Sequence, residues 1–166
     1  MKLLLPMMLL VTLLAGCFDS APEPPFSSGR EGQKLLAINY LKPDSTYASI
    51  DTSSGHPAIL FYITTVCPYC KAELEGLIKS VDSLGNTHVY LMTNSSLHDV
   101  REYEKEFKLD QYRKNFSLGI DTGRTMLKYF GIHAVPYIAV YNKDHILKQA
   151  FNGSTTTEKL RAVAAE

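Results

Sequence analysis

Cysteine is scarce in this sequence, and neither sign of charge is in excess. The chain has three cysteines, Cys17, Cys67 and Cys70, and its 17 basic residues balance 17 acidic ones without forming a basic stripe. A structural zinc site takes four cysteine or histidine ligands, and the five histidines form no His-x3-5-His pair to complement the single Cys-x-x-Cys. Zinc binding is therefore disfavoured, and the balanced charge argues against a nucleic-acid partner.

A long apolar run is also missing. The apolar stretch 3–14 contains Pro6 and is shorter than a comfortable membrane span. It leads into Leu-Ala-Gly-Cys at 14–17, which resembles the bacterial lipobox, in which the cysteine is lipidated and becomes the first residue of the mature protein. We therefore expect residues 1–16 to be a lipoprotein signal peptide and Cys17 to carry a lipid, with an ordinary signal peptide as the alternative.

The segment that follows is a predicted tether. Residues 17–33 are rich in proline, serine and glycine and lack hydrophobic periodicity, and an extended chain of about 16 residues reaches about 50 Å. Residues 34–166 are enough for one domain with its own core. With a lipid in a bacterial membrane, this domain is expected in the periplasm or on the extracytoplasmic side. A reduced cysteine pair needs its own electron source there.

The Cys-Pro-Tyr-Cys motif at 67–70 stands where a strand is followed by a helix. The apolar, β-prone run 58–63 precedes it, and apolar residues recur at helical spacing over 68–84. Unpaired N–H groups and the helix dipole favour a thiolate at Cys67, and the proline is well tolerated in the first turn. Cysteines three residues apart in a first turn are close enough for a disulfide. The pattern predicts a redox centre in Cys67 and Cys70.

The rest of the sequence alternates between strand and helix patterns. Two short strands are predicted before the motif, a parallel core around it and an antiparallel hairpin after it, which together give an α/β fold. The final helix is expected to begin after Gly153, with Thr155-x-x-Glu158 as a capping box. The predicted strands are 34–41, 46–51, 58–63, 88–92, 116–120, 137–141 and 146–151, and the other helices are 68–84, 97–108 and 122–129.

These features resemble the thioredoxin superfamily. The resemblance rests on the strand, the Cys-Pro-Tyr-Cys motif and its helix, and on Val135-Pro136 ahead of the hairpin, and it covers residue 34 to the C-terminus. It implies a thioredoxin fold: a central mixed sheet flanked by helices, with an N-terminal strand pair and an inserted helix and strand. It also implies that Pro136 is cis beside the cysteines and that the backbone of Val135 pairs with an extended client segment. Pro68 and Tyr69 are expected to support the site, with Tyr69 tuning its potential and client contact.

Within that superfamily, the sequence looks like the envelope-anchored TlpA, ResA and redoxin-type reductases. The shared features are predicted export and lipidation, two strands before the first core strand, and an extra helix and strand between Cys70 and Pro136. The resemblance implies a protein thiol–disulfide oxidoreductase, favouring reduction, with no cofactor beyond the Cys67–Cys70 disulfide. Its partners would be a membrane electron donor and disulfide-bearing envelope clients such as apocytochrome c. Glutaredoxins share Cys-Pro-Tyr-Cys and Val-Pro, but their glycine pair has no counterpart after Pro136.

The resemblance leaves the proton acceptor of Cys70 unassigned. Thioredoxins carry a buried acid six residues before the first cysteine, where this chain has Phe61, and usually a tryptophan just before that cysteine, where it has Val66. Four polar residues close to the motifs are interpreted as ordinary solvated or loop side chains, namely Glu73, Glu75, Lys71 and His133.

Two other functions on related folds are alternatives. Peroxiredoxins use Pro-x-x-x-Thr/Ser-x-x-Cys, and Thr64 stands three residues before Cys67, although Leu60 holds the proline position. A copper chaperone would use two cysteines and a distal histidine, but that family spaces its cysteines by three residues, and His133 precedes Pro136. A thiol–disulfide oxidoreductase is therefore the leading hypothesis, ahead of a peroxidase.

Overall fold

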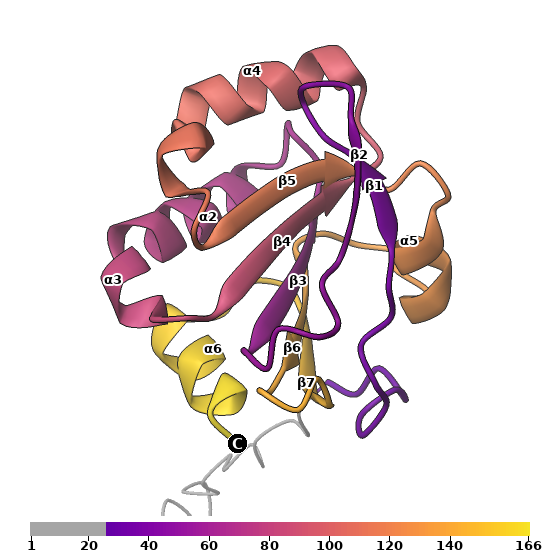
Figure 1. Cartoon of the computed structure of the whole chain (residues 1–166), viewed down its shortest axis with the longest axis vertical. Coiled ribbons are helices and arrows are strands. Elements are labelled where there is room, and N and C mark those ends of the chain that lie inside the picture. The colour runs from indigo at the N-terminus through magenta and orange to yellow at the C-terminus, as the bar shows by residue number, and fades with distance from the viewer. Residues whose placement is uncertain (1–25) are drawn as a thin grey trace, which may run out of the picture.

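The computed structural model describes residues 26–166. The predicted signal peptide, the predicted lipidation site Cys17 and the first part of the predicted tether lie outside these residues. No helix within 26–166 has the length and apolar character needed to cross a membrane. Figure 1 shows the arrangement: a single twisted sheet with helices on both of its faces.

A seven-stranded mixed sheet forms the centre of the molecule, in the order β2-β1-β5-β4-β3-β6-β7. β3 runs parallel to β4, and β4 parallel to β5, whereas the other neighbouring pairs are antiparallel. The predicted mixed sheet with an N-terminal strand pair is thus confirmed. The strands are β1 (Asn39–Leu41), β2 (Tyr47–Ser49), β3 (Ala58–Ile63), β4 (His88–Thr93), β5 (Phe116–Ile120), β6 (Tyr137–Tyr141) and β7 (Leu147–Asn152).

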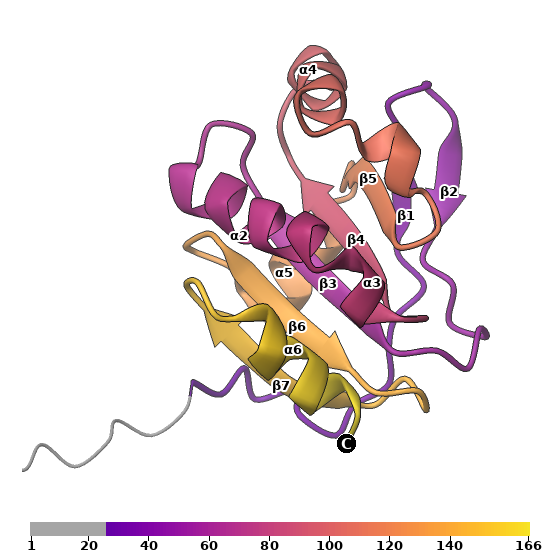
Figure 2. The ribbon, with the colours of Figure 1, turned by 90° about the vertical axis from the view of Figure 1, so that its left-hand side faces the viewer.

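The helices divide unequally between the two faces of the sheet, as Figures 1 and 2 show. Among the helices of residues 26–166, four contribute to the core on one face and α5 alone to the core on the other. The four are α2 (Pro68–Lys79), α3 (Val81–Leu84), α4 (Leu97–Phe107) and α6 (Thr157–Ala164), while α5 spans Thr125–Phe130 and a 3-10 helix, η1, spans Leu109–Tyr112.

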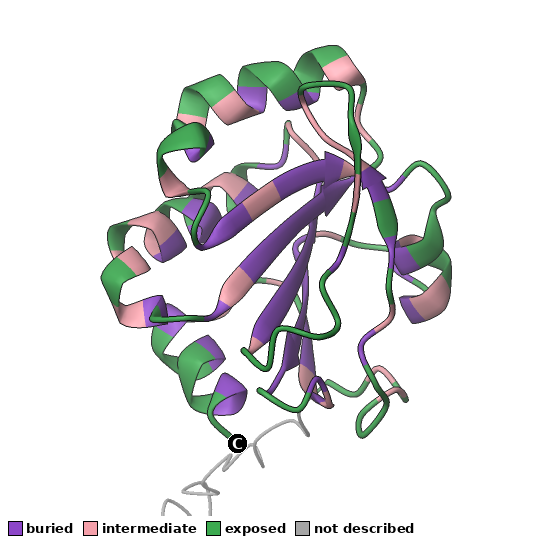
Figure 3. Cartoon of the chain, viewed as in Figure 1, coloured by how far each residue is buried: buried purple, intermediate pink, exposed green. Residues whose placement is uncertain are grey.

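β3 is buried along its whole length because side chains pack against both of its faces. Successive residues of a strand point to opposite faces, which gives the protein two cores. Figure 3 shows the result, with buried residues along the strands and exposed ones on the outer sides of the helices. The cysteine-side core includes Ile59, Phe61, Ile63, Cys67, Cys70, Leu74, Val100 and Tyr103. The opposite core includes Leu60, Tyr62, Tyr90, Met92, Met126, Phe130 and Tyr137.

Two predicted helices differ from the observed ones. The helix predicted over 68–84 is interrupted at Ser80, whose φ of −108° and ψ of 19° separate α2 from α3. The predicted capping box at Thr155 is wrong by one residue. The N-cap of α6 is Thr156, whose side chain accepts a hydrogen bond from the backbone N–H of Lys159 at 3.2 Å.

Residues 26–35, which we call the N-terminal strap, lie against the β7 end of the sheet. The N–H of Gly32 donates to the carbonyl of Leu147 at 2.8 Å, and the N–H of Leu147 donates to the carbonyl of Gln33 at 2.9 Å. The folded body therefore reaches into the segment that the sequence assigns to the tether. The strand predicted over 34–41 is shorter than expected, and regular pairing begins only at β1.

Candidate active site

The Cys-Pro-Tyr-Cys motif lies between the C-terminal end of β3 and the start of α2. Cys67 is the N-cap residue of α2, and its Sγ accepts a hydrogen bond from the backbone N–H of Cys70 at 3.1 Å. Pro68 occupies the first turn of the helix, where its missing N–H has no helical partner to lose. Both cysteines are free thiols. The structure therefore brings the two predicted redox residues together at one helix terminus.

The two cysteines differ in their access to solvent. Cys67 exposes 9% of its surface and Cys70 exposes 0%. Two exposed side chains stand beside Cys67, Val66 at 85% and Tyr69 at 69%. We call Val66, Cys67 and Tyr69 the rim. Cys67 thus keeps a small exposed surface beside the rim side chains, whereas Cys70 is closed to solvent.

The surroundings of Cys70 keep it a thiol at neutral pH. Burial raises the pKa of Cys70 well above its ordinary value, and the hydrogen bond between its side chain and that of Cys67 raises it further. A hydrogen bond from the backbone of Thr64 lowers the pKa in part. Cys70 is thus suited to act second, after Cys67 has reacted.

Val135 and Pro136 lie beside the end of β3 that leads into the motif. Their peptide bond is cis, as predicted, and β6 pairs with β3 from Tyr137 opposite Tyr62. Pro136 is buried, while Val135 is half-buried and packs against both cores. Among residues 26–166, the N–H and C=O of Val135 form no hydrogen bond outside the strand ladders. Val135 therefore combines a half-buried side chain with a backbone that forms no such bond.

Glu73 corrects one sequence-based expectation, because it is not a surface charge. Its side chain is buried with 8% exposure, and its carboxylate accepts a hydrogen bond from the N–H of Thr155 at 3.0 Å. Burial raises the pKa of Glu73, and the bond from Thr155 offsets part of that rise. Glu75 is exposed as predicted and lies 3.7 Å from Lys79. Glu73 therefore joins α2 to the start of α6.

Lys71 is also more than a solvated side chain. Its Nζ lies 2.7 and 2.8 Å from the two carboxylate oxygens of Glu106, so it joins α2 to α4. The same Nζ stands 6.0 Å from the ring centroid of Tyr103. His133 is exposed, in agreement with its interpretation as a loop residue.

Sequence reasoning did not single out Tyr103. This residue of α4 is 1% exposed, belongs to the cysteine-side core, and carries a buried hydroxyl without a hydrogen-bond partner. Periodicity places it on the apolar face of its helix. No local pattern indicates that its hydroxyl is buried without a hydrogen-bond partner.

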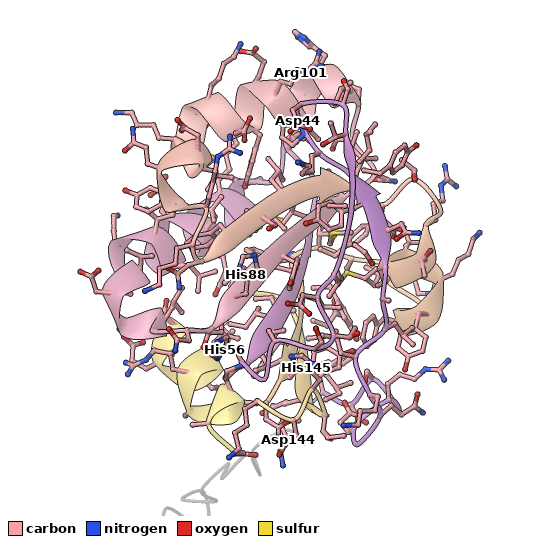
Figure 4. The ribbon with its side chains drawn as sticks, viewed as in Figure 1. Asp44, His56, His88, Arg101, Asp144 and His145 are labelled. Carbon is pink, nitrogen blue, oxygen red and sulfur yellow. The ribbon has the colours of Figure 1, made fainter. Side chains whose placement is uncertain are left out.

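Figure 4 labels several charged and histidine side chains that stand outside the Cys-Pro-Tyr-Cys motif in the sequence. His56 and His145 are near the lower end of that view, where Nε2 of His145 lies 2.9 Å from the carbonyl oxygen of His56. At the upper end, Arg101 of α4 donates to the carbonyl of Pro43 at 2.8 Å, next to Asp44. These contacts are internal to the fold and hold loops in place.

The family model of Redoxin matches residues 30–165. The chain belongs to the Redoxin family. This membership agrees with the resemblance to redoxin-type members of the thioredoxin superfamily that the motifs indicated. No curated protein matches the sequence.

Solved structures share the fold of this Redoxin-family chain at low identity. A secreted Mycobacterium tuberculosis disulfide oxidoreductase, described as homologous to E. coli DsbE, has a TM-score of 0.61 at 16% identity, covering 78% of this chain and 95% of that one. StoA from Bacillus subtilis has a TM-score of 0.57 at 18% identity, covering 77% and 96%. Peroxidoxin BcpB from Mycobacterium tuberculosis has a TM-score of 0.66 at 12% identity, covering 81% and 96%. The predicted thioredoxin fold is confirmed.

Proposed function

We propose that this Redoxin-family protein is a thiol–disulfide oxidoreductase that reduces disulfides in client proteins. The observation that carries the proposal is the difference between the two cysteines. Cys67 caps the helix at the exposed rim, and Cys70 is fully buried one turn away. An enzyme that exchanges disulfides through two thiols needs one sulfur that a client can reach. It also needs a second, sheltered sulfur that attacks the mixed disulfide after it has formed.

The reaction proceeds in two displacements. The thiolate of Cys67 attacks one client sulfur, the client disulfide breaks, and a mixed disulfide forms as the first client thiolate leaves. Cys70 then attacks Sγ of Cys67 as its proton passes to the second client sulfur, which forms the Cys67–Cys70 disulfide and releases that client thiol. Two electrons pass to the client, both client sulfurs take up protons, and no cofactor beyond the cysteine pair is required.

The rim and the Val135 backbone are suited to an extended client segment with apolar side chains. Val66 and Tyr69 offer exposed apolar surface beside Cys67, and the unpaired backbone of Val135 can add a short strand-like contact. Tyr69 and Val135 would thus position the client disulfide, while Pro68 and Pro136 shape the site.

We place this activity on the extracytoplasmic side of a bacterial membrane, with a lipid on Cys17 as the anchor. The support is the lipobox-like sequence at 14–17. A membrane protein would return two electrons to the Cys67–Cys70 disulfide after each cycle. The clients would be disulfide-bearing envelope proteins, apocytochrome c among them.

Reduction of insulin with dithiothreitol as electron source tests the proposal. The protein should accelerate insulin reduction, and Cys67→Ser should reduce the rate to that of dithiothreitol alone. In the host, Cys70→Ser should accumulate client proteins linked to Cys67, and the double variant Cys67→Ser/Cys70→Ser should capture none. Equal insulin activity in the Cys67→Ser variant would contradict the assignment.

The peroxidase alternative has no specific contact in its favour. Thr64 does meet Cys67, but through its backbone: the N–H of Cys67 donates to the carbonyl of Thr64 at 3.1 Å. The threonine hydroxyl forms no hydrogen bond with Sγ of Cys67 in the described residues. The two activities can be compared at the same dithiothreitol concentration. If the protein consumes hydrogen peroxide faster than it reduces insulin, the peroxidase function is favoured instead.

A further inference from the structure

A polar cavity of about 430 Å³ lies at the end of the sheet away from the Cys-Pro-Tyr-Cys motif. β1, β2 and the loop after β2 form one side of it, and the beginnings of β4 and β5 form the other. Because β4 runs parallel to β3, with His88 opposite Ala58, the cavity lies where β3 begins, whereas the motif follows the last residue of β3. The lining includes Asp51, Ser54, His88, Tyr90, Lys114 and Ser117.

His88 and Ser117 form a hydrogen-bonded pair in the wall of this cavity. Nε2 of His88 lies 2.9 Å from Oγ of Ser117, and Nδ1 of His88 lies 3.2 Å from the carbonyl oxygen of Lys114. A carbonyl oxygen only accepts, so Nδ1 carries the proton of the neutral ring, and Nε2 has a lone pair. The hydroxyl of Ser117 therefore donates to His88. Both side chains are half-buried.

This direction of donation requires His88 to be neutral. Burial lowers the pKa of His88 below its ordinary value, whereas the bond to the Lys114 carbonyl and the charge of Asp51 act in the opposite direction. The other titratable groups in the cavity wall are the side chains of His56, Tyr90 and Lys114. The ring of Tyr90 stands 4.6 Å from that of His88. Figure 4 places His88 above His56 in the same view.

A second serine of the cavity wall also contacts a histidine, but that histidine cannot act as its base. Oγ of Ser54 lies 3.3 Å from Nε2 of His145, and the same nitrogen lies 2.9 Å from the carbonyl oxygen of His56. Because the carbonyl only accepts, Nε2 of His145 carries a proton and has no lone pair to offer Ser54. Of these two serines, Ser117 is the one that faces a base.

We propose that Ser117 is an activated nucleophile with His88 as its general base, and that the cavity binds small uncharged esters whose acyl group Ser117 accepts. A serine hydroxyl is a weak nucleophile unless a neighbouring base, itself oriented by a third group, takes its proton. The carbonyl of Lys114 orients His88 in this way. The volume of the cavity suits a small molecule, and the carboxylate of Asp51 in its wall disfavours an anionic phosphate ester.

The reaction consists of two acyl transfers. Oγ of Ser117 bonds to the acyl carbon as its proton passes to Nε2 of His88, the ester C–O bond breaks, and the departing alcohol oxygen takes that proton. Water then attacks the acylated serine and gives a proton to His88, which returns it to Oγ of Ser117 as the carboxylic acid leaves. No oxidation or reduction occurs, so the activity is independent of the proposed disulfide exchange.

The test uses the full chain with all three cysteines replaced by alanine, so that no thiol reacts with the probes. After treatment with a fluorophosphonate, peptide mass spectrometry should find the adduct on Ser117 and none on Ser54. Labelling should be constant above about pH 7 and should fall as the pH drops below about 6.5, because protonated His88 cannot accept the serine proton. Equal labelling of Ser54 and Ser117, or no adduct on Ser117, would overturn the inference.

Hydrolysis of p-nitrophenyl acetate by the same cysteine-free chain gives a second readout. Ser117→Ala should reduce the rate to that of buffer, and His88→Gln should slow it at least about 100-fold, since glutamine can still form hydrogen bonds but cannot take up a proton. Ser83→Ala is the control, because it removes a hydroxyl that donates to the carbonyl of Ser80 outside the cavity, and it should leave the rate unchanged. An unchanged rate in Ser117→Ala would contradict the proposal, and the adduct mapping needs no substitution in the cavity.

Discussion

The rim and the inner wall of the active site meet at the cysteine pair but differ in their contact with solvent. The rim exposes apolar side chains around Cys67, whereas every member of the inner wall is at most 1% exposed. We define the inner wall as Phe61, Cys70, Leu74 and Tyr103. Exposed and fully buried surfaces therefore lie within the one helical turn from Cys67 to Cys70. Recognition can change at the rim without repacking the core.

The largest difference should be in stability. Leu74 is 0% exposed, so Leu74→Ala should lower the free energy of unfolding by about 2–5 kcal/mol. Val66 is 85% exposed, and Val66→Ala should change it by less than about 0.5 kcal/mol. Urea denaturation of the two variants measures both values. Similar losses would show that rim and inner wall are not physically distinct.

The second difference should be in thiol reactivity. Cys67 should react with iodoacetamide at neutral pH roughly 100-fold faster than Cys70, because Cys70 is buried and its raised pKa keeps it protonated. Quenched samples mapped by peptide mass spectrometry give the two rates. Faster labelling of Cys70 would reverse the assigned roles.

A third test uses Glu73, the carboxylate on the buried side of α2. Burial raises its pKa in the folded protein above 4.5, so the folded state binds this proton more tightly than the unfolded chain. Its contribution to stability is fully present below pH 4.5 and is lost as pH rises through the folded-state pKa. Glu73→Gln stays neutral and can still accept from Thr155.

The stability of the wild type relative to Glu73→Gln should therefore fall between pH 4 and pH 7, by less than about 1 kcal/mol. Thermal unfolding at a series of pH values gives this difference. A difference that grows with pH would mean that Glu73 is stabilised as a carboxylate, and that its bond from Thr155 outweighs its burial.

The smallest effect should come from the ion pair above the inner wall. Lys71 and Glu106 are 33% and 49% exposed, so Lys71→Met should cost about 0.2–1 kcal/mol, and high salt should remove the difference. Lys79→Met is the control, because its pair with Glu75 is longer and more exposed. An equal loss of unfolding free energy in both variants would show that the Lys71–Glu106 pair stabilises the protein no more than an exposed pair does.

Sequence patterns predicted the elements best where turn residues bound an apolar run. The strands predicted at 58–63, 116–120 and 137–141 agree with β3, β5 and β6. The same patterns missed the break at Ser80, because apolar residues keep their helical spacing on both sides of it. Periodicity reports which face is buried and not whether the helix is continuous.

A partner distant in sequence accounts for one of the other errors. Glu73 accepts from the N–H of Thr155, which is 82 residues away, and no local window contains that pair. The other two errors concern local capping. The N-cap of α6 is Thr156, which accepts from the N–H of Lys159. α5 begins at Thr125 rather than Thr122, and Asp121 accepts from its first N–H groups.

The active-site residues could be predicted from the sequence only where they form a local motif. The cysteine pair and the proline carry local signals, in a strand–helix junction and a Val-Pro step. Glu73 and Tyr103 do not, because a charged residue and an aromatic residue on a helix look alike in the sequence whether they face the interior or solvent. Only the packing of α4 and α6 against α2 shows what they contact.

The two edge strands of the sheet, β2 and β7, are protected in different ways. This protection affects how readily the protein aggregates at high concentration. β2 is three residues long, and the start of β7 is hydrogen-bonded by the N-terminal strap, which runs past it in Figure 2. An open strand edge is a template on which a second chain can pair. Within the described residues, one border is too short for such pairing and the other is partly occupied. The protein at high concentration should therefore resist edge-to-edge aggregation, and deletion of the strap should be the change that introduces it.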